Sequence, residues 1–237
     1  MGDVSINREQ AFLRNLYTMA ITRGKASENP VKKVRFAREE NGRTRFLTHD
    51  EEVRILACCI PSLTPLVVTA LHTGFRMSEL LSLTWHDVDF HRCLIAVRAA
   101  YAKNGESRSI PMNSILIEML RAMKGDTVGE AAVFCTSKGT PHRDFRTTFR
   151  QIVRKAGIED FRFHDLRHRF ASRLVMAGVD LPTVQALMGH KNVTMTMRYT
   201  HLSANHKQQA VALLEHFAEK VPAIVPTGRL AHAGAPL

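Results

Sequence analysis

The chain has 237 residues, 45% of them hydrophobic, which is enough to bury one substantial core with a small appendage. Its 33 lysines and arginines outnumber the 22 aspartates and glutamates, and the formal net charge of +11 favours a polyanionic partner such as nucleic acid. No run approaches roughly 18 apolar residues, and no small-residue cleavage site follows the first apolar stretch. The sequence therefore predicts neither a membrane-spanning helix nor a secretory signal.

The N-terminal region is predicted to contain one amphipathic helix and a basic linker. Residues 6–23 repeat apolar side chains with a helical period. The following residues, 24–45, contain a proline and two glycines and predict an extended linker. A solvated face is the usual explanation of so many basic residues, but at this net charge they favour contacts with a DNA backbone. Lys32, Lys33 and Arg35 are the predicted contacts.

A second unit, residues 46–222, is predicted to be mainly α-helical with one small antiparallel β-sheet, an α+β fold. Thr48 and Glu51 form a capping-box pattern at its first helix. Helices are predicted over residues 48–60, 63–73, 77–83, 114–123, 143–156, 164–177, 181–188 and 205–220. Residues 223–237 are rich in proline, alanine and glycine and predict a disordered tail.

The apolar period changes from 3.6 to 2 in residues 93–103 and 107–112, which flank the dipeptide Asn104-Gly105. This dipeptide is typical of a tight hairpin turn, so the pattern places Lys103 at the tip of a β-hairpin. A further short strand is predicted over residues 131–136.

Four groups of polar residues stand out. Three of them have an ordinary structural explanation, and the fourth is described in the next paragraph. Arg76 and Glu79, three residues apart on one helix, are typical of a surface ion pair. Lys103 at a hairpin tip would usually be solvated. Tyr199 would by default be half-buried, with its hydroxyl at the rim of the core.

The stretch "FHDLRHRFASRL" places His164, Arg167 and His168 on one side of a helix. Two histidines four residues apart suggest a zinc site. However, the metalloprotease pattern has a glutamate after the first histidine, where this chain has Asp165, and Arg167 would repel the metal. The four cysteines also lack the CxxC spacing of structural zinc sites, and we expect them to be reduced residues of a cytoplasmic protein. We therefore expect no metal site.

Taken together, these groups contain what phosphodiester chemistry without a metal requires. Arginines neutralise the non-bridging oxygens in the transition state. A lysine or histidine protonates the leaving oxygen, and a tyrosine hydroxyl attacks phosphorus. Because a phenol has an ordinary pKa of roughly 10, a cationic pocket is expected to make it nucleophilic. The basic helix over residues 143–156 would add the DNA contacts Arg146 and Arg150.

At this point the sequence resembles the tyrosine recombinases, or phage-type integrases. The stretches that carry the resemblance are "TGFRMSELLSLTW", "YAKNGESRSIPM", "HDLRHRFAS" and "MGHKNVTMTMRYTHL", in the family's order. The resemblance assigns catalytic roles to Arg76, Lys103, His164, Arg167, His190 and Tyr199. It assigns supporting roles to Glu79 and His168. Arg169 stands where the family commonly has a threonine.

The resemblance implies a site-specific recombinase or integrase that cleaves and rejoins double-stranded DNA through a 3′-phosphotyrosyl link, without ATP, metal or other cofactor. It also implies a tetramer on paired DNA sites, assembled through the helix at 205–220, and accessory directionality proteins. Such an enzyme would be bacterial or phage-encoded and nucleoid-associated in the cytoplasm. Residues 1–45 would be the last helix and linker of an otherwise absent core-binding domain, and residues 46–222 the catalytic domain.

Three alternatives remain open from the sequence. The chain could be a truncated prophage remnant that binds DNA without turnover, although its intact set of six catalytic positions favours an enzyme. It could relax supercoiled DNA as a tyrosine-type topoisomerase does. A zinc hydrolase is the third alternative, and full activity in a strong chelator would exclude it.

Overall fold

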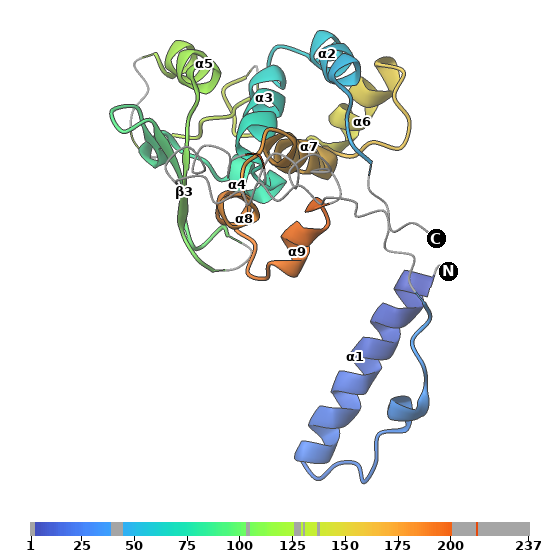
Figure 1. The fold of residues 1–237 in the computed structure, drawn as a ribbon. Helices are drawn as coiled ribbons and strands as arrows, with labels where there is room; N and C mark the ends of the chain where they lie inside the picture. The colour runs from blue at the N-terminus through green and yellow to red at the C-terminus, as the bar shows by residue number, and fades with distance from the viewer. Residues whose placement is uncertain are drawn as a thin grey trace, which may run out of the picture. The chain divides into compact units, whose positions relative to one another are not determined.

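A computed structural model describes residues 3–38, 45–102, 105–125, 129, 131–136, 138–200 and 212. The chain divides into two compact units, Met1–Arg45 and Phe46–Leu237 (Figure 1). The predicted helix at 205–220 and the predicted tail at 223–237 lie outside the described residues, apart from residue 212. No helix in the described ranges is long and apolar enough to cross a membrane.

The N-terminal unit contains helix α1 (Asp3–Thr22) and the short 3-10 helix η1 (Pro30–Lys33). The segment after α1 is not extended throughout, because it returns along the helix and is held by two asparagines. Asn29 donates to the Arg14 carbonyl at 2.9 Å, and the buried Asn7 exchanges hydrogen bonds of 2.9 and 2.8 Å with the backbone of Ala37. These side chains therefore tie the returning segment to α1 through backbone groups.

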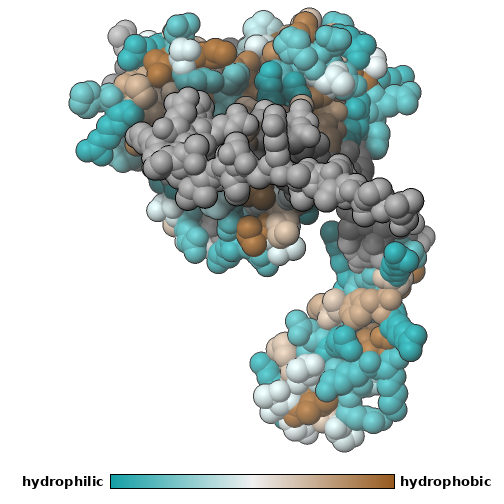
Figure 2. Space-filling model, viewed as in Figure 1, coloured by the Kyte–Doolittle hydropathy of each residue, from teal (hydrophilic) through white to brown (hydrophobic). Residues whose placement is uncertain are grey.

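Helix α1 exposes several large apolar side chains. Phe12 is 67% exposed and Leu16 and Met19 are about half exposed, and hydrophobic atoms are visible on this unit in Figure 2. Its assignment as part of a core-binding domain stays a prediction.

Except for α9, which was not predicted as a helix, the helices described in the second unit begin and end close to the predicted positions. They are α2 (His49–Cys58), α3 (Thr64–Thr73), α4 (Met77–Leu81), α5 (Ser114–Lys124), α6 (Arg146–Lys155), α7 (Phe163–Met176), α8 (Leu181–Met188) and α9 (Thr194–Met197). The predicted capping box is present, since the Thr48 hydroxyl accepts from the Glu51 N–H at 3.2 Å and Glu51 accepts from the Thr48 N–H at 3.0 Å. Local hydrogen-bonding chemistry therefore sets these boundaries.

Helices α3 and α7 pack against each other in the centre of the unit. Gly74 ends α3 with φ of 64°, and a Cβ at this position would lie 2.5 Å from the ring of Phe170 on α7. A side chain here would have to displace that buried ring in addition to adopting a left-handed backbone. The glycine therefore lets the end of α3 approach α7 closely, which brings the chain on either side of it to the polar residues of α7.

The sheet has three antiparallel strands in the order β1 (Val88–Asp89), β2 (Leu94–Val97) and β3 (Arg108–Pro111). The hairpin is confirmed, but the prediction that its first strand continues to Lys103 was wrong. The ladder ends at the pair Val97 and Arg108, and the amides of Tyr101 and Ala102 bond to the Arg98 carbonyl instead. Successive alanines at 99 and 100 favour this turn over a strand, because alanine has low β-propensity.

The predicted strand at 131–136 is not formed. Its backbone makes two isolated bridges, from Ala132 to Thr84 and from Cys135 to Pro141. The side chains of Val133 and Phe134 are buried in the core. The apolar residues in this stretch therefore reflect burial and not pairing in a sheet. Together the elements give a mainly helical unit with one small antiparallel sheet, as predicted.

Helix α2 is joined to α7 by a largely buried ionic cluster. Glu52 accepts from Arg169 at 3.0 Å and from Arg173 at 2.9 Å, and its side chain is 9% exposed. Arg169, which departs from the common threonine, is thus compensated by a carboxylate from a distant helix.

We expect Glu52→Ala to lower the free energy of unfolding by about 3 kcal/mol, because it leaves the buried Arg169 charge without its partner. Urea unfolding monitored by circular dichroism would measure the change. Asp50→Ala, an exposed carboxylate in the same helical turn, is the matched control and should have little effect. Equal unfolding midpoints for the two variants would show that the cluster contributes nothing net.

Candidate active site

Five of the six predicted catalytic residues line one pocket of about 340 Å³. They are Arg76, His164, Arg167, His190 and Tyr199, and the supporting residue His168 lines the same pocket. Four separate segments contribute, namely the start of α4, α7, the residues after α8, and the residues after α9. Lys103 lies outside the described residues.

Arg76 precedes α4 and is held by Glu79. The Glu79 carboxylate accepts from the Arg76 backbone N–H and from its guanidinium, each at 2.8 Å. Glu79 is only 2% exposed, so this is a buried ion pair and not the surface pair that spacing alone suggests. Burial by itself would raise the pKa of Glu79, but hydrogen bonds and charge from Arg108, with the bonds from Arg76, lower it below its usual value.

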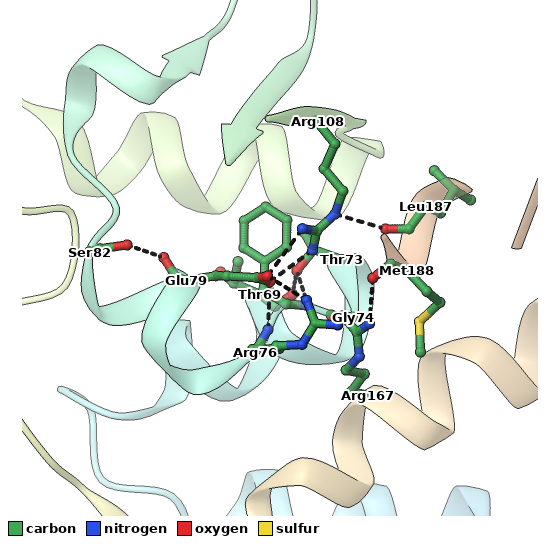
Figure 3. A network of polar contacts seen from close by, with 11 residues as sticks. Thr69, Thr73, Gly74, Arg76, Glu79, Ser82, Arg108, Arg167, Leu187 and Met188 are labelled. Atoms are coloured by element: carbon green, nitrogen blue, oxygen red, sulfur yellow. Dashed lines mark hydrogen bonds and ion pairs between the residues drawn. The ribbon is translucent and has the colours of Figure 1, made fainter. Parts of the chain in front are cut away.

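Arg108 is a residue that the sequence interpretation missed. From β3, its guanidinium donates to both Glu79 oxygens at 3.1 and 2.8 Å, and to the Leu187 carbonyl of α8 at 3.2 Å (Figure 3). Its side chain passes Gly189, where an added Cβ would lie 3.1 Å from it. The clue in the sequence was an arginine at the start of the return strand, but only the fold shows that it connects three of the motifs.

Arg167 is 2% exposed and is fixed by backbone carbonyls from two other segments. One nitrogen donates to Gly74 at 2.6 Å and another to Met188, as Figure 3 shows. Burial, and then the nearby Arg76, lower its pKa to about 9, so the group stays cationic at neutral pH. The guanidinium is therefore held rigidly at the pocket before any ligand arrives.

His190 follows Gly189, which ends α8 in a left-handed conformation with φ of 61°. Its Nδ1 lies 2.9 Å from the Thr196 hydroxyl, and Gln185 donates to its carbonyl at 3.0 Å. Burial, and then the charges of Arg167 and Arg76, lower the pKa of His190 to about 3. The ring is thus neutral in the unliganded protein at physiological pH.

Tyr199 is completely buried, in contrast to the half-buried position expected from its sequence. Its hydroxyl lies 2.5 Å from His168 Nδ1, and the two ring centroids are 5.9 Å apart. Burial raises the pKa of Tyr199 to about 12, although Arg198 and Arg167 act in the opposite direction. The expectation that the cationic pocket alone would favour the phenolate was therefore wrong for the unliganded chain, because desolvation outweighs the arginines.

The histidines of α7 stack edge to face, with the ring centroids of His164 and His168 5.0 Å apart. Burial is the main reason that the pKa of each is lowered, with that of His168 falling to about 4. Within the described parts of the chain, no group of three or more histidine, cysteine or acidic side chains is arranged to hold a metal ion.

The predicted DNA contacts lie on both units. Arg146 and Arg150 are exposed on α6 and line a second pocket, which shares His164 with the first. Lys32, Lys33 and Arg35 are exposed on the N-terminal unit. Arg198, expected to be only a flanking residue, lines the main pocket beside Tyr199 and adds a further positive charge there.

The sequence model of the phage integrase family matches residues 45–206. This chain belongs to the phage integrase family. The resemblance that the motifs indicated is thereby confirmed.

Curated relatives of this integrase-family chain include phage and bacterial recombinases. The integrase of Salmonella phage P22 is 31% identical over 201 residues, which cover 80% of this chain and 52% of the relative. Tyrosine recombinase XerC of Xanthomonas campestris is 30% identical over 214 residues, covering 85% of this chain and 65% of the relative. The chain thus spans between half and two-thirds of the length of these relatives.

Solved structures confirm the fold. The integrase of transposon Tn1549, in complex with transposon right end DNA, superposes with a TM-score of 0.73 at 24% identity and covers 90% of this chain and 80% of that one. The catalytic domain of bacteriophage HP1 integrase gives a TM-score of 0.57 at 29% identity, with 70% and 93% covered.

Proposed function

We propose that this chain is a site-specific DNA recombinase or integrase, which cleaves and rejoins double-stranded DNA by transesterification through Tyr199. The main support is that five of the predicted catalytic side chains, Tyr199 among them, come from four segments and line one pocket. The curated relatives are integrases and recombinases, and the Tn1549 neighbour was solved with DNA. The fixed positive charges of the pocket would also stabilise the negative charge that develops on a phosphodiester in the transition state.

In the proposed reaction, Arg76 and Arg167 bind the non-bridging oxygens of the scissile phosphate. The Tyr199 oxygen bonds to phosphorus, and the bond from phosphorus to the 5′-oxygen breaks. The leaving oxygen takes a proton from a lysine or histidine, for which Lys103 is the candidate lysine, and becomes a 5′-hydroxyl. The 3′-phosphotyrosyl link conserves the bond energy, and attack by a second 5′-hydroxyl releases Tyr199 and joins the strands.

The preorganised part of this site is the arginine pair. Both guanidinium groups are anchored by protein acceptors in the unliganded chain, so little reorganisation is needed when a phosphate arrives. Glu79 and Arg108 act as supports that hold Arg76 and connect it to β3 and α8. This arrangement is the observation that supports the proposed role of Glu79.

The DNA contacts and assembly are also proposals. Exposed Arg146 and Arg150 would bind phosphates next to the pocket, and Lys32, Lys33 and Arg35 would bind those along the N-terminal unit. Assembly as a tetramer on paired sites, through the helix predicted at 205–220, and the use of accessory directionality proteins rest on the family resemblance. The site of action would be the cytoplasm, where the chromosome is.

Covalent capture tests the proposed chemistry without knowledge of the target sequence. A pool of nicked duplexes with a randomised region is incubated with the full chain, and DNA that stays attached to protein in detergent is recovered and amplified. A nick near the cleavage point lets a short strand escape and traps the covalent link. Proteolysis and mass spectrometry then locate the attached nucleotide among Tyr17, Tyr101 and Tyr199.

We expect the nucleotide on Tyr199 alone. DNA that is bound but never attached would favour a non-catalytic DNA-binding remnant. Attachment together with relaxation of a supercoiled plasmid that carries no paired sites would favour a topoisomerase-like activity.

A further inference from the structure

We propose that His168 is a further catalytic residue, which takes the proton from the Tyr199 hydroxyl as the phenolic oxygen bonds to phosphorus. This rests on the function proposed above and adds the missing base to it. Transfer of the proton to Nδ1 gives an imidazolium, while the electron pair of the O–H bond forms the bond to phosphorus. When the 5′-hydroxyl later attacks, the imidazolium returns the proton to the departing tyrosine oxygen.

The geometry singles out His168. Its Nδ1 lies 2.5 Å from the phenolic oxygen, which is within the reach that a general base requires. The two neighbouring cations of the pocket, Arg167 and Arg198, have no lone pair to accept a proton. His190 instead contacts the Thr196 hydroxyl through its Nδ1.

The position of His168 on α7 makes it a fixed acceptor. It follows Arg167, whose guanidinium is anchored on two carbonyls, and its ring packs against that of His164 one turn earlier. With the hydrogen on Nε2, the Nδ1 lone pair points at the hydroxyl. His168 and the phosphate-binding Arg167 are thus consecutive residues of one helix. The helix therefore fixes the position of the base relative to the bound phosphate.

The charges around the pair set the timing of the transfer. His168 faces His164 and Arg167 on its own helix and Arg198 from the segment of Tyr199, and Arg76, His190 and Lys191 are the other charged or titratable residues that line the pocket. Burial, and then the charges of His164, Arg198 and Arg167, lower the pKa of His168 to about 4, and burial raises that of Tyr199 to about 12, so the proton stays on the tyrosine in the unliganded chain. A bound phosphodiester anion offsets the positive charges that oppose protonation of His168.

The test compares cleavage of the captured duplex by the wild-type chain and by His168→Gln between pH 6 and pH 9. Glutamine offers an oxygen for the hydrogen bond but cannot take up a proton. We expect cleavage by His168→Gln at pH 7 to be slower by about 10² to 10⁴, which is the usual contribution of a general base. Its rate should then rise about tenfold per pH unit, as the phenolate fraction does, whereas the wild-type rate should change little.

Two further measurements distinguish proton transfer by His168 from a role in which it only positions the Tyr199 hydroxyl. Incorporation of a fluorinated tyrosine of lower pKa at position 199 should restore much of the rate of His168→Gln and change the wild type little. The exposed His86→Gln is the matched control and should behave as wild type. An unchanged pH profile in His168→Gln, or a defect that fluorotyrosine does not relieve, would overturn the proposal.

A spectroscopic measurement needs no variant and guards against misfolding. Nitrogen-15 NMR of the full wild-type chain at pH 7 should show Nδ1 of His168 without a proton. A proton on Nδ1 would leave no acceptor and would overturn the proposal whatever the kinetics. If the wild-type chain forms no adduct at all, the proposed function fails and this inference with it. An adduct formed equally well by His168→Gln overturns this inference alone.

Discussion

Replacement of Tyr199 by phenylalanine is expected to abolish covalent attachment of the chain to DNA and to leave non-covalent binding unchanged. The hydroxyl oxygen is the atom that would bond to phosphorus, and among the described residues that line the pocket no other side chain carries a hydroxyl. The ring that fills the core remains, so the variant loses one hydrogen bond, to His168, at a cost of about 1 kcal/mol in the free energy of unfolding.

The other two tyrosines provide matched controls for this experiment. Tyr17→Phe and Tyr101→Phe remove the same atom at positions that do not line the pocket. Denaturing gel electrophoresis with the captured duplex would measure attachment, and a gel-shift assay would measure binding. A covalent band that persists in Tyr199→Phe but disappears in one of the controls would assign the nucleophile elsewhere.

The second large effect is expected for Arg167→Ala, which should slow cleavage by about 10² to 10³. Removing one preorganised donor at a developing charge costs about 3 to 4 kcal/mol in the transition state. The same change leaves the buried carbonyls of Gly74 and Met188 without their donor, so the free energy of unfolding should also fall, by about 1 to 3 kcal/mol.

A second variant separates the loss of cleavage rate from the loss of folding stability. Arg167→Lys keeps a positive charge but cannot reproduce the fork that reaches both carbonyls, so it should recover part of the binding and little of the rate. Arg121→Ala, an exposed arginine on α5 outside the pocket, is the control. Single-turnover cleavage and urea unfolding would be measured on each protein. Near wild-type cleavage by Arg167→Ala would contradict the assignment of this residue.

The local elements of the fold could be predicted from the sequence because they depend on short-range chemistry. The capping box of Thr48 and Glu51, the glycine after α3 and the exact bounds of α8 all follow from neighbours within four residues. The hairpin strands and the predicted strand at 131–136 were less predictable. Strand pairing depends on partners far away in the chain, and an apolar run only reports that it is buried.

The sequence by itself determined the family, and with it the catalytic candidates, because residue type and order are all that a motif contains. The tertiary structure decided how those residues are supported. It placed Arg108 between Glu79 and α8, and it brought His168 within 2.5 Å of the Tyr199 hydroxyl. It also reversed the expected direction of the tyrosine pKa. Spacing along a chain fixes which groups share a helix, but burial and the distance between segments are set only when the helices pack, and these decide where a proton rests.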